Sequence, residues 1–379
     1  MAAIVTRALR VLFQNVRGGT LHCQHKARDC WRCEKRYLLS DNVIRLMEFQ
    51  QKKVAIANQM YVSREQYFNN IEEKLKKNEL ILKDDLKTLL HLCQTPSDVQ
   101  VAKDLIYRYH SENRNTAFGE FKFGPLFVRL CYELGLEETA EEMVKDQNLK
   151  GFFSDSTSFN IVMDMLFMKE RYESALGVLL EMKNQDIKFS KDTYTLAFAV
   201  CYKMNTSEAY KICSMLLEES LARGDFIPRH AFCFAIALAV KQNYIDKARS
   251  IYSHILHTDS KICLNLHVLL LALSGAQQNL LSVLETTVVN NVPTFVKKLD
   301  FSQEVLTAVR KTLKNNLELQ RRFEDVCDTL QRSGQITALS LDDMLCHTPN
   351  GKKPINHLLF TRKVSRRTFK PLRSALLSE

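Results

Sequence analysis

Residues 158–183 read SFNIVMDMLFMKERYESALGVLLEMK, and this stretch decides the fold. The residues three, four, seven and eight positions after Phe159 are all apolar, which is the stripe of a helix buried on one side. A short polar turn follows at 169–173, and Ala175 then opens a second apolar stripe. A small residue there lets two helices approach closely. The stretch therefore predicts a helical hairpin.

The same pattern recurs along the chain at intervals of about 35 residues. Each copy has an aromatic residue, an apolar stripe, a polar turn and an alanine. The aromatic residues are Phe123, Phe159, Tyr194 and Phe232, and the alanines are Ala140, Ala175, Ala209 and Ala248, with a weaker copy upstream at Ala102. Stacked hairpins that bury their apolar sides against one another explain this order. We predict an all-α protein, an α-solenoid of stacked helical hairpins with a helical C-terminal region.

Residues 156–190 resemble a pentatricopeptide repeat. Ser158-Phe159-Asn160 resembles the opening of that repeat, and residues 170–175 resemble its turn and the entry to its second helix. Tetratricopeptide repeats are the near alternative, but their signature Trp is missing, because the only Trp is Trp31. The resemblance implies a mitochondrial protein that binds organelle transcripts and takes part in mRNA maturation.

The resemblance also implies which residues read the bases. In such repeats the first helix lines a groove, and one repeat faces one base. The residue after the opening aromatic and the last residue of the repeat set base choice, which points to Asn160 with Ser190 and to Thr195. Gly124, in the preceding repeat, has no side chain for such a contact. The other interpretation of a Thr or Asn near a helix start is a helix cap.

Five segments are expected from these patterns and from the charge. The net charge is +10, and most of the excess lies at the two ends. Residues 1–28 hold five Lys or Arg and no acid, which is typical of a mitochondrial presequence. The segments are a presequence (1–36), an N-terminal helical segment (37–80), the repeats (81–263), a C-terminal helical region (264–345) and a basic tail (346–379). In the tail, Arg366, Arg367 and Lys370 flank Phe369, a mixture that suits single-stranded RNA.

The sequence offers little for catalysis. It has no phosphate-binding Gly-rich loop, no His-Glu-x-x-His and no Gly-x-Ser-x-Gly, and Asp342-Asp343 is the one tempting acidic pair. We expect a non-enzyme without cofactor, metal site, transmembrane segment or small-molecule substrate. The expected partners are single-stranded mitochondrial RNA and RNA-processing or ribosome-associated proteins, in the matrix. The alternative is a scaffold that binds a protein in the groove.

Overall fold

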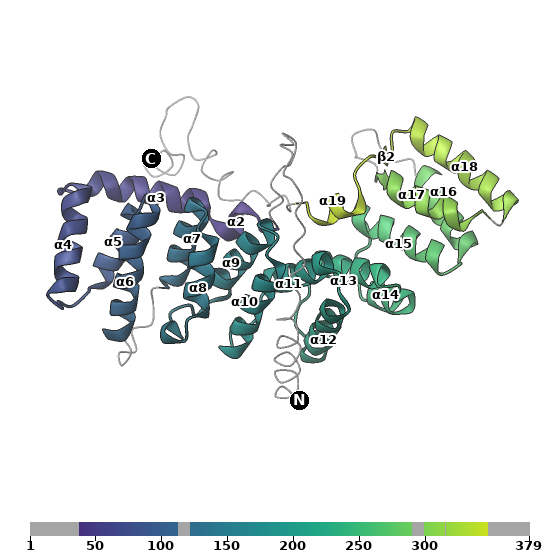
Figure 1. Ribbon diagram of the computed structural model, residues 1–379. Coiled ribbons are helices and arrows are strands. Elements are labelled where there is room, and N and C mark those ends of the chain that lie inside the picture. Colours follow the sequence, from purple (N-terminus) through teal and green to yellow (C-terminus); the bar gives the residue numbers. More distant parts are fainter. Residues whose placement is uncertain (1–37, 113–121, 290–298, 315, 348–379) are drawn as a thin grey trace, which may run out of the picture.

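A computed structural model describes residues 38–112, 122–289, 299–314 and 316–347. The predicted presequence and most of the basic tail, with Arg366, Arg367 and Lys370, lie outside these residues. The described chain is almost entirely helical, as predicted, and its helices form an elongated array (Figure 1).

Six consecutive helical hairpins make up the central array of the described chain. Their helices are α5 (Lys83–Leu92) and α6 (Pro96–Glu112), α7 (Gly124–Leu134) and α8 (Glu137–Lys145), α9 (Ser156–Met168) and α10 (Tyr172–Asn184), α11 (Lys191–Met204) and α12 (Ser207–Arg223), α13 (Arg229–Lys241) and α14 (Ile245–Tyr252), and α15 (Lys261–Leu273) and α16 (Gln277–Val289). A 3₁₀ turn, η2 (Gln147–Leu149), follows α8. From α7 onward, the first helix of each hairpin packs on the first helix of the next, up to α15. This arrangement confirms the predicted α-solenoid.

The predicted anchors lie in the core. The four aromatic anchors are buried, and Ala102, Ala140, Ala175, Ala209 and Ala248 are each 0% exposed. A side chain larger than a methyl group would have no room at these alanines, where the two helices of a hairpin meet. The turns between paired helices are alike too, because each of five turns holds one residue with a left-handed backbone. These residues are Gly135, Glu170, Asn205, Asn243 and Gly275.

The N-terminal helical segment comprises α2 (Asp41–Ile44), α3 (Leu46–Gln59) and α4 (Arg64–Lys76). The helix α3 packs across α5 and α7, while α2 contacts α9. Figure 1 shows α3 running along one side of the array, across the ends of several helices. This segment therefore covers the first helices of three successive hairpins, α5, α7 and α9. We call the surface formed by the first helices of all the hairpins, from α5 to α15, the first-helix face.

The C-terminal region has a second hydrophobic core. It is built from α15, α16, α17 (Gln303–Thr312) and α18 (Leu317–Arg332), and it includes Leu284, Phe301 and Phe323. Two short parallel strands, β1 (Phe301–Ser302) and β2 (Ile336–Thr337), were not predicted. A two-residue strand is too short to show the alternation that marks strands in a sequence. The last described helix, α19 (Leu341–Leu345), packs on α13 and α15.

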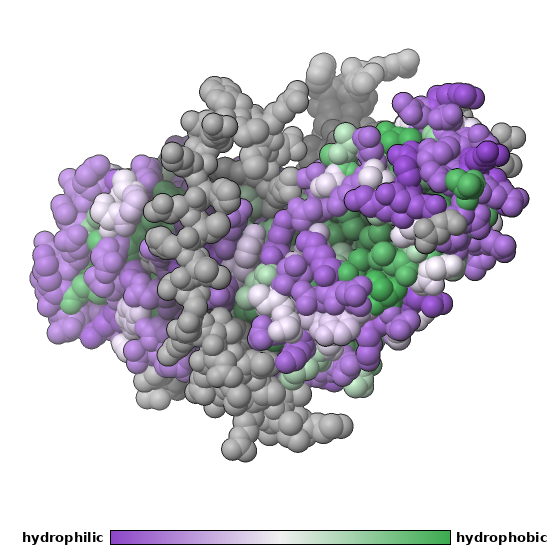
Figure 2. Space-filling view, turned by 45° about the vertical axis from the view of Figure 1, so that its right-hand side comes forward, coloured by the Kyte–Doolittle hydropathy of each residue, from purple (hydrophilic) through white to green (hydrophobic). Residues whose placement is uncertain are grey.

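The surface is mostly hydrophilic in the view of Figure 2, with hydrophobic residues gathered mainly in a recess in its right half. Within the described ranges, no helix is both long enough and apolar enough to span a bilayer.

Candidate nucleic-acid interface

Asn160 and Ser190, predicted to read one base together, contact each other directly. Ser190 is the N-cap of α11, and the amide Nδ2 of Asn160 donates to its Oγ at 3.0 Å. The hydroxyl of Thr193 donates to Oδ1 of Asn160 at 2.8 Å. Asn160 is only 2% exposed. These bonds tie α9 to the start of the next first helix, and the base contact predicted for the two residues stays a prediction.

One other hairpin has an asparagine at the same place, five positions after the N-cap of its first helix. Counted in this way, Asn265 is the equivalent of Asn160, and the sequence analysis missed it because no aromatic residue precedes it. Asn265 is 0% exposed, its Oδ1 accepts from the backbone N–H of Ser302 at 2.8 Å, and its Nδ2 donates to the carbonyl of Asp300 at 3.0 Å. Ser302 is in turn the N-cap of α17. An Asn at this position therefore joins one first helix to the next in both halves of the molecule.

Gly124 follows the aromatic Phe123 as Asn160 follows Phe159, and it is a glycine for a packing reason. A Cβ added there would lie 2.8 Å from Oγ of Ser158 and 2.9 Å from Cδ1 of Phe153. Both distances are shorter than a van der Waals contact, so only glycine fits without a shift of its neighbours.

Thr195 is more accessible than Asn160. It is partly exposed, and its hydroxyl donates to the carbonyl of Lys191 at 3.1 Å, within its own helix. Such a bond back to the preceding turn is common for Thr in helices and exchanges easily for another acceptor.

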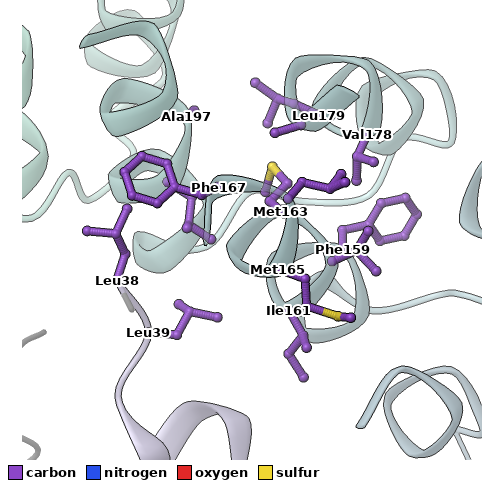
Figure 3. Close-up of a cluster of buried hydrophobic side chains, with 14 of the residues drawn as sticks. Leu38, Leu39, Phe159, Ile161, Met163, Met165, Phe167, Val178, Leu179 and Ala197 are labelled. Carbon is purple, nitrogen blue, oxygen red and sulfur yellow. The ribbon is translucent and has the colours of Figure 1, made fainter. Parts of the chain in front are cut away.

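The cover formed by α2 and α3 is attached through a buried carboxylate on α9. Oδ1 of Asp164 accepts from the backbone N–H groups of Leu38, at 2.9 Å, and Leu39, at 3.3 Å. Both leucine side chains belong to the same buried core as Phe167 and Met165, and Figure 3 shows Leu38 beside Phe167. Burial raises the pKa of Asp164 to about 7, although the two N–H donors favour the charged form. The sequence analysis did not single out Asp164.

Beneath this cover lies a cleft of about 700 Å³, which we call the basic cleft. Its walls come from α2, α3, α5, α7 and the start of α9. Five of the residues that line it are Lys or Arg, and none of its described lining residues is an acid. The basic residues are Arg45, Lys52, Lys87, Lys122 and Arg129. Because like charges in a low-dielectric recess repel one another, this lining favours an anion.

The two arginines of the cleft, Arg129 and Arg45, hold the end of α2 and its junction with α3 in place. Arg129 donates from Nε to the carbonyl of Ile44 at 2.5 Å, which anchors the end of α2 on α7. Burial lowers the pKa of Arg129, and the nearby charge of Arg45 lowers it further. Arg45 joins α2 to α3 with a φ of 56°, which is uncommon for a residue with a Cβ. Glu48 partly offsets the charge, since it lies 2.9 Å from Lys52 and 4.0 Å from Arg45.

The other end of the first-helix face carries different chemistry. Asp342 of α19 forms an ion pair with Lys203 of α11 at 2.7 Å, and Nε2 of His230 lies 2.6 Å from the carbonyl of Leu345. Asp343 joins Ser340 in a capping box at the start of α19. The acidic pair thus stabilises the position and the start of α19. No group of three or more His, Cys, Asp or Glu in the described ranges is arranged to hold a metal ion.

Comparisons with known proteins agree with this architecture. A family model described as "Mitochondrial 28S ribosomal protein S27" matches residues 16–349. Proteins named "Pentatricopeptide repeat-containing protein 2, mitochondrial" from Homo sapiens, Mus musculus and Xenopus laevis are 52%, 54% and 52% identical to the chain. The alignments cover 99%, 92% and 94% of this chain, and 96%, 93% and 92% of the three relatives. The chain belongs to this family of mitochondrial pentatricopeptide repeat proteins.

The membership confirms the resemblance seen in residues 156–190 and supports the mitochondrial location that the basic N-terminus predicts. A solved structure, the pentatricopeptide repeat protein PPR10 from maize, aligns over 98% of this chain and 64% of that chain. The identity is 10% and the TM-score 0.33, which is too low to add to the argument.

Proposed function

We propose that this protein binds single-stranded RNA in the mitochondrial matrix and acts in the maturation, processing or stabilisation of mitochondrially encoded mRNA. The basic cleft carries the proposal, because it places five Lys or Arg side chains against the first helices of a pentatricopeptide solenoid. The phosphate backbone supplies much of the affinity of any RNA complex. A recess lined by Lys and Arg side chains is therefore where an RNA strand would gain most binding energy.

Base contacts by Asn160, Ser190 and Thr195 remain part of this proposal. Thr195 is partly exposed and would exchange only a bond within its own helix. Asn160 and Ser190 would have to exchange bonds that now join α9 to α11. We therefore expect Thr195 to contribute more readily to base choice than the Asn160–Ser190 pair.

The basic tail would add affinity without base choice. Arg366, Arg367 and Lys370 carry charge for phosphates, and Phe369 offers a surface on which a base can stack. Removal of residues 350–379 is expected to weaken RNA binding similarly for all sequences.

Crosslinking in intact mitochondria tests the proposal. RNA attached to the protein is recovered and sequenced. Recovery of one or a few mRNA segments at defined positions is the expected result. If proteins co-purify strongly and no RNA rises above background, the protein is a scaffold and the proposal fails.

The family match supports a second candidate, an association with the small subunit of the mitochondrial ribosome. The matching family model is described as a 28S ribosomal protein, and the match spans residues 16–349. Within the described residues, the covers pack on first helices, so a protein or ribosomal partner would bind on the second helices. The same crosslinking separates the two candidates, since ribosomal RNA would be recovered in place of mRNA, and the protein would sediment with ribosomal subunits.

A further inference from the structure

The basic cleft contains a buried group that lacks a partner. His91 of α5 lines the cleft and is 3% exposed, and its Nε2 has no hydrogen-bond partner among the described residues. Leaving a buried polar atom unpaired is costly, and native proteins seldom do so without a reason. Because His91 is a lining residue of the cleft, a ligand that enters the cleft deeply enough to reach this buried atom would supply the missing partner.

The chemistry of that partner follows from the other ring nitrogen. Nδ1 of His91 lies 2.6 Å from the backbone carbonyl of Lys87. A carbonyl only accepts, so Nδ1 carries the hydrogen, and Nε2 of the neutral ring is an acceptor. Burial, and the charges of Lys87, Lys52 and Lys53, lower the pKa of His91 and keep the ring neutral. The cleft therefore combines several cations with one acceptor that needs a hydroxyl or amino hydrogen.

We propose that the basic cleft binds the phosphate of a ribonucleotide, with the Lys and Arg side chains on the phosphate and Nε2 of His91 accepting from a ribose hydroxyl. A phosphate carries the negative charge that the lining favours, and the 2′-hydroxyl is the donor that distinguishes RNA from DNA. The volume of about 700 Å³ lies within the range of pockets that hold small organic ligands. The proposal rests on the proposed function for the identity of the macromolecule, RNA. The argument from the residues that line the cleft does not depend on that function.

The position of the cleft supports a role in the path of the strand. Lys122, Arg129 and Thr157 come from the α7 and α9 side, and Lys52 and Ile56 come from α3. A nucleotide held there would be clamped between the cover and the first-helix face. Such a clamp fixes one phosphate of a strand and so sets the register of the neighbouring repeats.

Binding of the full chain to fluorescein-labelled decauridylate, followed by anisotropy, tests the proposal. The variant K87Q/K122Q removes two cations of the cleft. The control K150Q/K211Q removes the same charge from two exposed lysines that do not line the cleft. Lys150 directly follows η2, and Lys211 lies on α12. We expect the cleft variant to bind at least about tenfold more weakly and the control to stay within about twofold.

The variant His91→Phe tests the acceptor. The ring keeps its packing beside Phe49, whose centroid lies 5.5 Å away, and loses Nε2. Wild-type protein is expected to prefer decauridylate over its 2′-deoxy counterpart, and His91→Phe should lose that preference. Circular dichroism of each variant confirms that the helices are intact. Equal preference in wild type and His91→Phe would overturn the role of His91.

A comparison of several ligands identifies what occupies the cleft. Tighter binding of 5′-phosphorylated than of 5′-hydroxyl decauridylate indicates a terminal phosphate, and equal binding indicates an internal one; both support the proposal. Calorimetric binding of uridine monophosphate without binding of decauridylate supports the cleft chemistry and contradicts RNA binding.

Decauridylate binding that K87Q/K122Q leaves unchanged overturns the cleft proposal and leaves RNA binding intact. Preference for decaglutamate over both nucleotide probes would show a site for acidic peptides and overturn it as well.

Discussion

The covers over the two halves of the first-helix face are held by different chemistry. In the N-terminal half, a buried carboxylate, Asp164, accepts two backbone N–H groups of the covering chain. In the C-terminal half, a partly exposed ion pair between Lys203 and Asp342 holds α19. The first cover lies over the basic cleft. The second cover places an acid, Asp342, on the first-helix face. The contrast favours the N-terminal half as the place where the phosphates of the proposed RNA ligand would bind.

The largest expected effect is a pH dependence confined to the N-terminal cover. The pKa of Asp164 is raised from 3.8 to about 7, so the folded protein binds more protons than the unfolded chain between these values. Stability from this group is therefore fully present below about pH 4 and is lost as pH rises through about 7. The difference is on the order of 4 kcal/mol. Hydrogen exchange of the Leu38 and Leu39 amides should accelerate over this range beyond its intrinsic pH dependence.

Asp164→Asn is the control for that dependence. It keeps an acceptor for both N–H groups and cannot ionise, so the extra acceleration should disappear. An unchanged pH profile in Asp164→Asn would show that another group is responsible.

Removal of the acceptor is expected to loosen the same cover. Asp164→Ala leaves the two N–H groups without their partner, and we expect a loss of about 2–4 kcal/mol in the local stability of residues 38–59. Mass spectrometry of deuterium uptake by peptides from α3 and from α19 measures it. Equal loosening of both peptides would mean that the two covers are not independent.

The two equivalent asparagines sharpen the comparison within the solenoid. Asn265→Ala leaves the buried N–H of Ser302 unpaired and should cost about 1–3 kcal/mol. Asn160→Ala should cost less, about 1 kcal/mol, because Ser190 and Thr193 still bond to each other. Chemical unfolding of the two variants compares them. A larger loss for Asn160→Ala would indicate that the α9–α11 junction depends on the amide more than its contacts suggest.

The smallest effect is expected at the C-terminal cover. Lys203→Met removes an ion pair whose side chains are 22% and 32% exposed, so we expect a cost of about 0.5–1 kcal/mol that shrinks in high salt. Deuterium uptake should rise in α19, and affinity for decauridylate should not change. Weaker RNA binding in Lys203→Met would place RNA on the C-terminal half and contradict the contrast between the two covers.

The solenoid was predictable because its signals are local and repeated. The stripes after Phe159 and Tyr194 and the alanines such as Ala175 each fix a helix within a few turns, and the repeat period fixes how the helices stack. The resemblance to a pentatricopeptide repeat implied that Asn160 and Ser190 act together on one base, and that role stays a prediction. The contacts that the two residues make could not be predicted from the sequence, because burial of Asn160 depends on how closely adjacent hairpins approach.

The basic cleft could not be predicted from the sequence. Its lining comes from stretches around residues 45, 87, 125 and 157, which lie far apart in the chain and show no common pattern. The attachment of residues 38–39 to Asp164 joins positions more than 120 residues apart, and a single Asp inside an apolar helix gives no hint of its partner. Asn265, in contrast, could have been found in the sequence, because it lies five positions after Ser260, the N-cap of α15.

Mapping the protein residues that crosslink to RNA in mitochondria tests the central claim most directly. After ultraviolet irradiation and digestion, mass spectrometry identifies the peptides that carry a nucleotide. We predict adducts on peptides that contain Lys87 and His91, and Lys122 to Arg129, with none on the peptide of α19. Adducts found only on α19, on the second helices or on the basic tail would contradict the assignment of RNA to the covered N-terminal half of the first-helix face.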